Sequence, residues 1–383
     1  MTSLSHKLFN KIDGRTIDLL VHLGSGQVSL ALVYKNDQET PVVLQARTKK
    51  VPFNNNPTPT ELQENVIKAF DLSLAEFVTE LGGMYEINDL YDSHQAIHAV
   101  YVTLSPLWTT TDLVTHTDTF TEPTVITQEM IQEYINTYTT ENTIDASVVS
   151  AEANKYQINP EDVIGMETPE IELQIKASEL SQSTKEKIER ILESHISTER
   201  IEMIDYIPSP VVMVSAVTQL FGTNEEYMIV HIDAEDSHVV TKTKTDGMKF
   251  GSVSYGLAEI KRQLILAGYV PDFVHARDLL RAYFDYALEE GLGSKIDYTL
   301  SIESQVLANL VGDMTVRSVP LFVLADDNSE HFFDRYVVQD LENVSNAVEI
   351  ETEHFEEVYD VVGEYVQPTR EILALLLHTS LKK

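Results

Sequence analysis

The chain has 383 residues, 27 of them lysine or arginine and 61 aspartate or glutamate, so its formal net charge is −34. A hydrophobic fraction of 43% suffices for well-packed cores, which excludes an entirely disordered chain. The acidity argues against direct binding of nucleic acid or anionic lipid, because no cluster of basic residues is present to neutralise phosphates.

Cysteine is absent, which excludes disulfides, thiolate zinc sites and cysteine nucleophiles. The N-terminus has no apolar signal core. The longest apolar run, Ile372–Leu377, is far shorter than the roughly 20 residues that a membrane-spanning helix needs. These features predict a soluble, cytoplasmic protein without direct membrane insertion.

The first predicted elements form a hairpin: an apolar strand over 16–23, the turn Gly24-Ser25-Gly26, and a second apolar strand over 27–34. A third strand is expected over 41–46. A helix follows from Thr60, with apolar residues at helical spacing, and Gly82-Gly83 ends it.

The segment 96–197 predicts a compact α+β module. Its expected elements are a strand over 97–104, a threonine-rich extended segment over 109–120, a helix over 127–138, strands over 147–158 and 170–177, and a helix over 183–195.

The rest of the chain predicts a second strand-rich unit. Strand 200–207 and helix 210–221 come first, then strands 227–233, 237–243 and 248–254, helices 257–267, 276–290 and 302–310, strand 320–325, helix 332–341, strand 348–351 and helix 369–381. Residues 17–34 and 229–249 are both units of an apolar strand, a tight turn and an apolar strand, each followed by a third strand and a helix. This duplication predicts two related lobes that face each other.

In this order the segments resemble the actin-like superfamily, within it the group of the cell-division protein FtsA and the pilus-assembly protein PilM. The stretches that carry the resemblance are 17–29 and 227–256 for the two phosphate loops, 320–329 for the adenosine loop, and 100–135 with 163–191 for the small inserted subdomain. The resemblance implies an α/β, actin-like (RNase H-like) fold of two lobes with a small α+β subdomain inserted in the first.

The same resemblance divides the chain. It implies a first lobe over 1–95 and 198–224, an inserted subdomain over 96–197, and a second lobe over 225–383 with a short helical insert at about 265–317.

Several positions depart from the family pattern. The aspartate expected before the first glycine of the first loop is His22, and the second loop, which in the family reads Asp-x-Gly-Gly-Gly, reads here His231, Ile232, Asp233, Ala234, Glu235, Asp236. Asp326 and Asp327 stand where the adenosine loop has adjacent glycines.

Physical chemistry indicates what these changes do. Two unit charges about 4 Å apart interact by about 4 kcal/mol at an effective dielectric near 20. Three carboxylates facing a triphosphate would outweigh the roughly 8 kcal/mol of a micromolar affinity. Only Gly24, Ser25, Gly26 and Gly256 are then candidates for binding a nucleotide. The sequence predicts a degenerate nucleotide cleft, no catalytic residue and no cofactor, with ATP and magnesium as the alternative.

Two groups of side chains allow further interpretations. The acidic runs 233–236 and 326–327 contain potential Mg²⁺ or Ca²⁺ ligands, but without the pattern of a calcium-binding loop we interpret them as solvated turns. His22 and His231 would both point into a cleft between lobes, where they bind a metal, sense pH, or pair with neighbouring carboxylates; we favour the last.

The C-terminal segment 369–381 spreads its apolar residues over about two thirds of a helix circumference, which is typical of a buried helix rather than a membrane anchor. It resembles the closing helix of the family's second lobe. Recruitment to the inner face of the membrane would then need a protein partner.

Two functions remain open. The first is a non-catalytic scaffold of the FtsA/PilM type in cell division or pilus assembly, which binds partners such as a membrane-anchored peptide or a filament protein, or itself. The second is an ATP-binding assembly protein that polymerises or switches with nucleotide. An enzyme of the sugar-kinase branch is disfavoured, because no general-base aspartate or working phosphate loop is evident.

Overall fold

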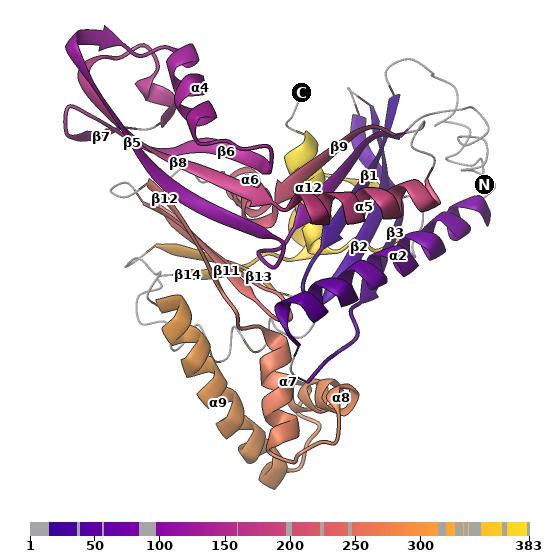
Figure 1. Ribbon diagram of the computed structural model, residues 1–383. Helices are drawn as coiled ribbons and strands as arrows, with labels where there is room; N and C mark the ends of the chain where they lie inside the picture. Colours follow the sequence, from indigo (N-terminus) through magenta and orange to yellow (C-terminus); the bar gives the residue numbers. More distant parts are fainter. Residues whose placement is uncertain are drawn as a thin grey trace.

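The structure is a computed structural model, and it describes residues 15–36, 39–55, 57–83, 97–158, 160–196, 201–222, 226–243, 247–312, 319–325, 332, 336, 346–361 and 366–380. Within these residues the chain forms two lobes, each built on one sheet, and a third, smaller sheet projects from the first lobe (Figure 1). The predicted helix over 332–341 lies largely outside the described residues.

The first lobe contains a six-stranded sheet in the order β15-β3-β2-β1-β4-β9. β1, β2 and β3 are antiparallel neighbours, whereas β4 and β9 continue the sheet parallel to β1. The bounds of these strands are β1 Arg15–Leu23, β2 Gln27–Asn36, β3 Glu39–Lys50, β4 Ile97–Leu104, β9 Ile201–Pro208 and β15 Asp360–Val361.

The second lobe repeats this pattern in a five-stranded sheet, β12-β11-β10-β13-β14. β10 and β11 form an antiparallel hairpin and β12 adds to it, while β13 and β14 are parallel to β10. The duplication predicted from the two strand-turn-strand units is thus present in the topology. The bounds are β10 Tyr227–Ile232, β11 Ser237–Thr243, β12 Gly247–Val253, β13 Pro320–Ala325 and β14 Asn346–Glu349.

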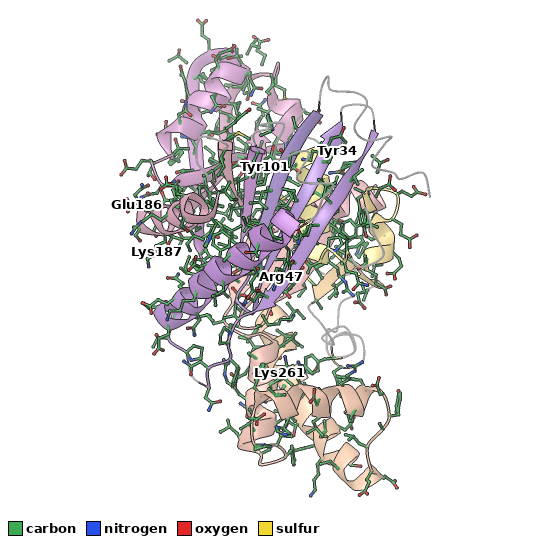
Figure 2. All side chains as sticks on the ribbon, turned by 90° about the vertical axis from the view of Figure 1, so that its right-hand side faces the viewer. Tyr34, Arg47, Tyr101, Glu186, Lys187 and Lys261 are labelled. Atoms are coloured by element: carbon green, nitrogen blue, oxygen red, sulfur yellow. The ribbon has the colours of Figure 1, made fainter. Side chains whose placement is uncertain are left out.

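Helices cover both faces of the first sheet. α2 (Pro59–Gly83) and α5 (Gln182–His195) pack on one face, where apolar residues of both helices join the core formed by β1 and β2. Arg47 of β3 reaches across to α2 and pairs there with Glu76 and Glu80 (Figure 2).

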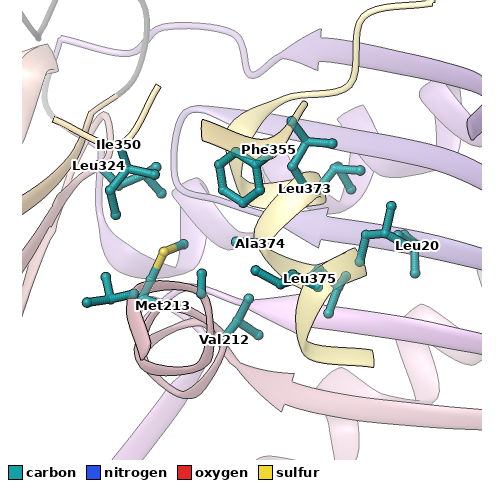
Figure 3. Close-up of a cluster of buried hydrophobic side chains, with 14 of the residues drawn as sticks. Leu20, Val212, Met213, Leu324, Ile350, Phe355, Leu373, Ala374 and Leu375 are labelled. Atoms are coloured by element: carbon teal, nitrogen blue, oxygen red, sulfur yellow. The ribbon is translucent and has the colours of Figure 1, made fainter. Parts of the chain in front are cut away.

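A second core lies between the two sheets and contains α6 (Ser209–Phe221) and α12 (Arg370–Ser380). Figure 3 shows Leu373 and Leu375 of α12 among Leu20 of β1, Met213 of α6 and Leu324 of β13. This arrangement buries α12 on almost every side, which agrees with the predicted distribution of its apolar residues.

The outer face of the second sheet is covered by α7 (Leu257–Leu266), α8 (Phe273–Phe284) and α9 (Glu290–Gly312), which share a third core with β10 and β13. The region expected to hold a helical insert, 265–317, is helical over α8 and α9.

The small third sheet has the order β5-β8-β6-β7 and carries α4 on one face. The predicted strand 147–158 is a hairpin of β6 and the short β7, because Asn154 and Lys155 adopt positive φ and turn the chain back. The bounds are β5 Thr109–Val125, α4 Gln128–Thr137, β6 Thr143–Ala153, β7 Tyr156–Ile158 and β8 Glu167–Leu180, with short 3₁₀ turns at Pro160–Val163 and Thr352–Phe355.

The predicted domain ranges include elements that pack elsewhere. β4 and α5 lie within 96–197, yet β4 pairs with β1 and α5 contributes to the core of the first lobe. The inserted sheet itself therefore spans β5 to β8.

The prediction that the C-terminal helix belongs to the second lobe needs a correction. β15 pairs with β3 of the first sheet, and α12 contacts β1, β2 and α6. The physical reason is that the inner face of the first sheet is apolar and α12 is the apolar helix that covers it.

Candidate functional site

The turn between β1 and β2 brings backbone amides of the first lobe to the second lobe. The Ser25 amide donates a hydrogen bond of 2.6 Å to Oδ2 of Asp233, and the Gly26 amide donates one of 3.3 Å to Oδ1 of the same carboxylate. Two adjacent amides that bind the two oxygens of one carboxylate form an anion site. The anion that occupies this site is a side chain of the protein itself.

The turn between β10 and β11 contributes the other half of this contact. Oδ1 of Asp233 also accepts the Ala234 amide at 2.7 Å. The Ser25 hydroxyl donates to Oδ1 of Asp236 at 2.9 Å and accepts the Glu235 amide at 3.0 Å. The two turns, which lie in different lobes, are therefore joined by a buried hydrogen-bond network.

Three glycines permit this close contact. A Cβ at Gly26 would lie 2.2 Å from the Cβ of Ala234, and a Cβ at Gly24 would lie 2.7 Å from Oδ2 of Asp233. A Cβ at Gly256 would lie 2.4 Å from two carbonyl oxygens of the β10–β11 turn. The glycines thus allow the backbones of the two turns and of the α7 entry to approach each other.

The N-terminus of α7 is bonded to the same turn. The Leu257 amide donates to the Asp233 carbonyl at 3.2 Å, and the Ala258 amide donates to the Ala234 carbonyl at 2.7 Å. Helix N-termini bind anions through such amides. In α7 the first amides already have backbone partners.

A further contact joins the lobes beside the turns. The side chain of Phe53, in the segment between β3 and α2, stacks on Phe273 at the start of α8 with ring centroids 3.7 Å apart. Arg262 of α7 lies over the Phe53 ring and pairs with Glu235 at 2.7 Å. Burial raises the pKa of Glu235, and the Arg262 bond opposes that rise. Figure 2 shows the neighbouring residue Lys261 on α7.

Behind the turns lies a buried cluster of imidazoles. His22 of β1, His231 of β10 and His238 of β11 are each exposed by 2% or less. Nε2 of His231 lies 3.6 Å from Oε1 of Glu371, the buried carboxylate in the first turn of α12. Strand β1 of the first lobe and strands β10 and β11 of the second therefore meet α12 at this cluster.

Burial acts differently on the groups of this cluster. It lowers the pKa of His22 and, with the nearby charge of His231, lowers the pKa of His238 well below the usual value. For His231 burial also acts to lower the pKa, but the hydrogen bond to Glu371 and the negative charges of Glu371, Asp233 and Asp236 together outweigh burial, so the pKa is raised. The pKa of Glu371 is lowered, because the two imidazoles outweigh the effect of burial. A charged His231 paired with a charged Glu371 is the state that these shifts favour.

The carboxyl of Asp236 has a different environment. Burial and the negative charge of Asp233 raise its pKa to about 7, although the Ser25 hydrogen bond opposes the rise. Near neutral pH, the Asp236 carboxyl therefore holds a proton part of the time.

The structure gathers most of the predicted site residues in one place. His22, Gly24, Ser25 and Gly26 of the first lobe contact His231, Asp233, Ala234, Glu235 and Asp236 of the second, with Gly256 packed against them. Asp326 and Asp327 lie outside the described residues. The sequence predicted that the carboxylates of 233–236 would repel a phosphate at this cleft; in the structure they bind the first turn and Arg262.

Four participants were missed from the sequence: Phe53, His238, Arg262 and Glu371. Glu371 had a usable signal, because it is a charged residue directly before the apolar run 372–377, in a helix that the sequence predicts to be buried. Arg262 and Phe53 belong to no motif in the sequence, and only the contact between lobes gives them a role.

Several cavities lie near the joined turns. One of about 300 Å³ lies between the lobes beside the Phe53–Phe273 stack and includes Lys50, Lys261 and Arg277 in its lining. Another, of about 620 Å³, lies between β13, β3 and the start of α12. Both are large enough for part of a partner molecule.

Two kinds of feature are absent from the described part of the chain. Its histidine, aspartate and glutamate side chains form no group of three or more suited to hold a metal ion. Its helices do not include one with both the length and the hydropathy needed to cross a bilayer.

No protein-family model matches the sequence, and no curated protein sequence matches it. Solved structures do match in shape. One, described as the PilM-PilN type IV pilus biogenesis complex, has a TM-score of 0.57 and 13% identity, covering 97% of this chain and 98% of that chain.

Two others have lower scores. Ethanolamine utilization protein EutJ from Carboxydothermus hydrogenoformans has a TM-score of 0.44 and 12% identity, over 97% of this chain and 90% of that one. A Bacteroides thetaiotaomicron protein with actin-like ATPase fold and unknown function has a TM-score of 0.37 and 11% identity, over 96% of this chain and 99% of that one.

The match to the PilM chain extends over nearly all of both proteins and includes the two lobes and the inserted sheet. The predicted fold class is therefore confirmed: the chain has the actin-like two-lobe α/β fold and is similar in structure to PilM.

Proposed function

We propose that the protein is a non-catalytic actin-like scaffold of the FtsA/PilM type, which binds protein partners in a pilus or cell-division assembly. The observation that carries the proposal is the bond of Asp233 to the amides of Ser25 and Gly26. Those amides are the donors that a phosphate would need at this turn, and a carboxylate of the protein already uses them.

The residues present do not fit a nucleotide triphosphate at this place. The methyl group of Ala234 fills the space against Gly26, the first amides of α7 are bonded to the β10–β11 turn, and Asp236 adds a second carboxyl beside Asp233. A phosphate would have to displace these groups and overcome their charge. We therefore expect neither ATP hydrolysis nor a resident cofactor.

A scaffold of this kind needs a protein partner. The PilM structure is a complex with PilN. By analogy, we expect this chain to act in the cytoplasm and to be recruited to the inner face of the membrane by a membrane-anchored protein that offers a peptide. The candidate surfaces for such a partner are the cavities beside the joined turns and, separately, the inserted sheet.

The alternative is an ATP-binding assembly protein, in which the turns separate to admit nucleotide and Gly24, Ser25, Gly26 and Gly256 bind it. It is favoured by the retention of glycine at positions 24, 26 and 256. The two proposals differ in what Mg-ATP does to stability. A ligand present at 100 times its dissociation constant stabilises the folded state by about 2.7 kcal/mol.

Thermal unfolding with and without Mg-ATP, and with EDTA added, tests this difference. We expect no shift of the melting temperature for the natural sequence. The matched variant is Asp233→Gly, which frees the amides of Ser25 and Gly26. Stabilisation of only this variant by Mg-ATP would identify Asp233 as the group that excludes phosphate. Stabilisation of the natural sequence by Mg-ATP, abolished by EDTA, would instead establish the ATP-binding alternative.

A further inference from the structure

Helix α9 carries apolar side chains on two sides. Ile296, Leu300 and Leu307 are buried in the core of the second lobe. On another side, Tyr298 is 70% exposed, and Ile302, Val306 and Leu310 are 42%, 40% and 40% exposed. Single exposed apolar residues are common on protein surfaces, but a continuous row along one helix is typical of a contact surface.

The spacing of the row defines its shape. The four residues are four positions apart, so they form a ridge of the i±4 type, inclined to the helix axis. With a rise of 1.5 Å per residue, the ridge extends for about 18 Å along α9. The natural occupant of such a surface is another helix with the same ridge.

The charge of the row is unusual for this protein. From Tyr298 to Leu310 the only charged residue is Glu303, and it is buried and bonded to Tyr255. The other exposed residues of this stretch, Gln305 and Asn309, are neutral. In a chain with a net charge of −34, two copies can approach through a neutral face at a much lower electrostatic cost than through acidic ones.

We propose that α9 is the surface through which two copies of this chain associate, with the two helices antiparallel about a two-fold axis. The axis passes near position 304, so Ile302 faces Val306 of the partner subunit and Tyr298 faces Leu310 of the partner subunit. A two-fold pairing uses the same patch on both copies, and here it opposes larger and smaller apolar side chains. The antiparallel arrangement also places opposite ends of the two helix dipoles side by side.

The association is expected to be weak. Stable interfaces bury roughly 1,200–2,000 Å² in total, and one helix face supplies less than that. The negative charges elsewhere on the two copies repel each other. At physiological ionic strength, salt largely screens this repulsion between charges more than about 8 Å apart. Added sodium chloride should therefore strengthen the pairing, whereas it would weaken binding of a basic partner. The pairing does not depend on whether the turns at Gly24 and Asp233 admit nucleotide.

Disulfide cross-linking tests the register. Because the natural chain contains no cysteine, any covalent dimer must form through the introduced residues. The variants Ile302→Cys and Val306→Cys are oxidised separately and as a mixture. We expect several-fold more covalent dimer from the mixture, because position 302 of one copy faces position 306 of the other. Leu266→Cys, at a side chain of α7 that is 77% exposed, is the control for random collision.

The possible results separate the models. Equal cross-linking of each variant alone and of the mixture would overturn the antiparallel register. Cross-linking no greater than that of Leu266→Cys would overturn the pairing through α9.

Sedimentation equilibrium provides a measurement without cross-linking. The natural chain should show concentration-dependent dimer that increases with sodium chloride. Val306→Asp should shift it to monomer, and Leu266→Asp, which adds the same charge to α7, should not. Circular dichroism of both variants should be unchanged, because both side chains are exposed. A natural chain that is monomeric at high salt, or a Val306→Asp variant that dimerises as well as the natural chain, would refute the proposal.

Discussion

Replacement of Asp233 by asparagine should destabilise the protein substantially. The carboxylate accepts three backbone hydrogen bonds, from Ser25, Gly26 and Ala234, and is 2% exposed. Asparagine keeps one acceptor oxygen, so at least one of these amides faces an NH₂ donor instead. A hydrogen bond to a charged group contributes about 1.5–3 kcal/mol, and a buried donor left without a partner adds a cost of similar size.

We expect Asp233→Asn to lower the free energy of unfolding by about 2–4 kcal/mol. The measurement is urea unfolding at about pH 6, where Asp236, with a pKa of about 7, is largely protonated and its repulsion of Asp233 is small. Without that precaution, loss of the repulsion in the variant would offset part of the effect.

Asp272→Asn is the matched control. Asp272 caps the N-terminus of α8 by accepting the His275 amide, and asparagine caps helices about as well as aspartate. The control should therefore change stability little. If Asp233→Asn lost no more than this control, the carboxylate would not be joining the lobes, and the explanation for the closed phosphate loops would fail.

Two further substitutions test the site, and a third, in α9, is a control for replacement of glycine. Because folding raises the pKa of Asp236 to about 7, the native state holds an extra proton between about pH 4 and 7, and this group makes stability fall as pH rises in that window. Asp236→Asn should remove that part of the pH dependence of the melting temperature. An unchanged pH dependence would contradict the assignment. Gly26→Ala should be strongly destabilising, because its Cβ would lie 2.2 Å from that of Ala234. In a double-mutant cycle, the second change Ala234→Gly should restore part of the lost free energy of unfolding, and additive effects would show that the two methyl groups do not meet. Gly293→Ala, in α9 with no atom near the new Cβ, should instead raise the free energy of unfolding by about 0.5–1 kcal/mol, measured by urea unfolding. A lower free energy of unfolding in this variant would show that alanine at a glycine position is harmful without any steric conflict.

The sequence predicted the sheets well because hydrophobic alternation and turn residues are local. The hairpins at 16–34 and 227–243, with their Gly24-Ser25-Gly26 and 233–236 turns, are defined by neighbours within a few residues. The equivalence of these two units then predicted the paired lobes. The less accurate ranges involve packing between distant elements: α5 and β4 were assigned to the insert, and α12 to the second lobe.

The candidate site was predicted as a set of positions but not as a set of contacts. Aspartate in place of glycine suggested that phosphate would be repelled at an open cleft. The structure adds the reason that the cleft is not open there: the carboxylate of Asp233 is bonded to Ser25 and Gly26, about 210 residues earlier in the chain. A pattern within one turn carries no information about which distant amides it will meet.

By itself the sequence determined the two similar lobes, the inserted module, the buried character of the last helix and the acidic residues in the second loop, because each follows from local spacing, composition or charge. Only the tertiary structure decided that the acidic loop binds the glycine turn of the other lobe, that His231 pairs with Glu371, and that α9 keeps a neutral apolar ridge on its surface. These features depend on which surfaces meet when the lobes pack together, and that is set by the burial of the whole chain rather than by any one segment of it.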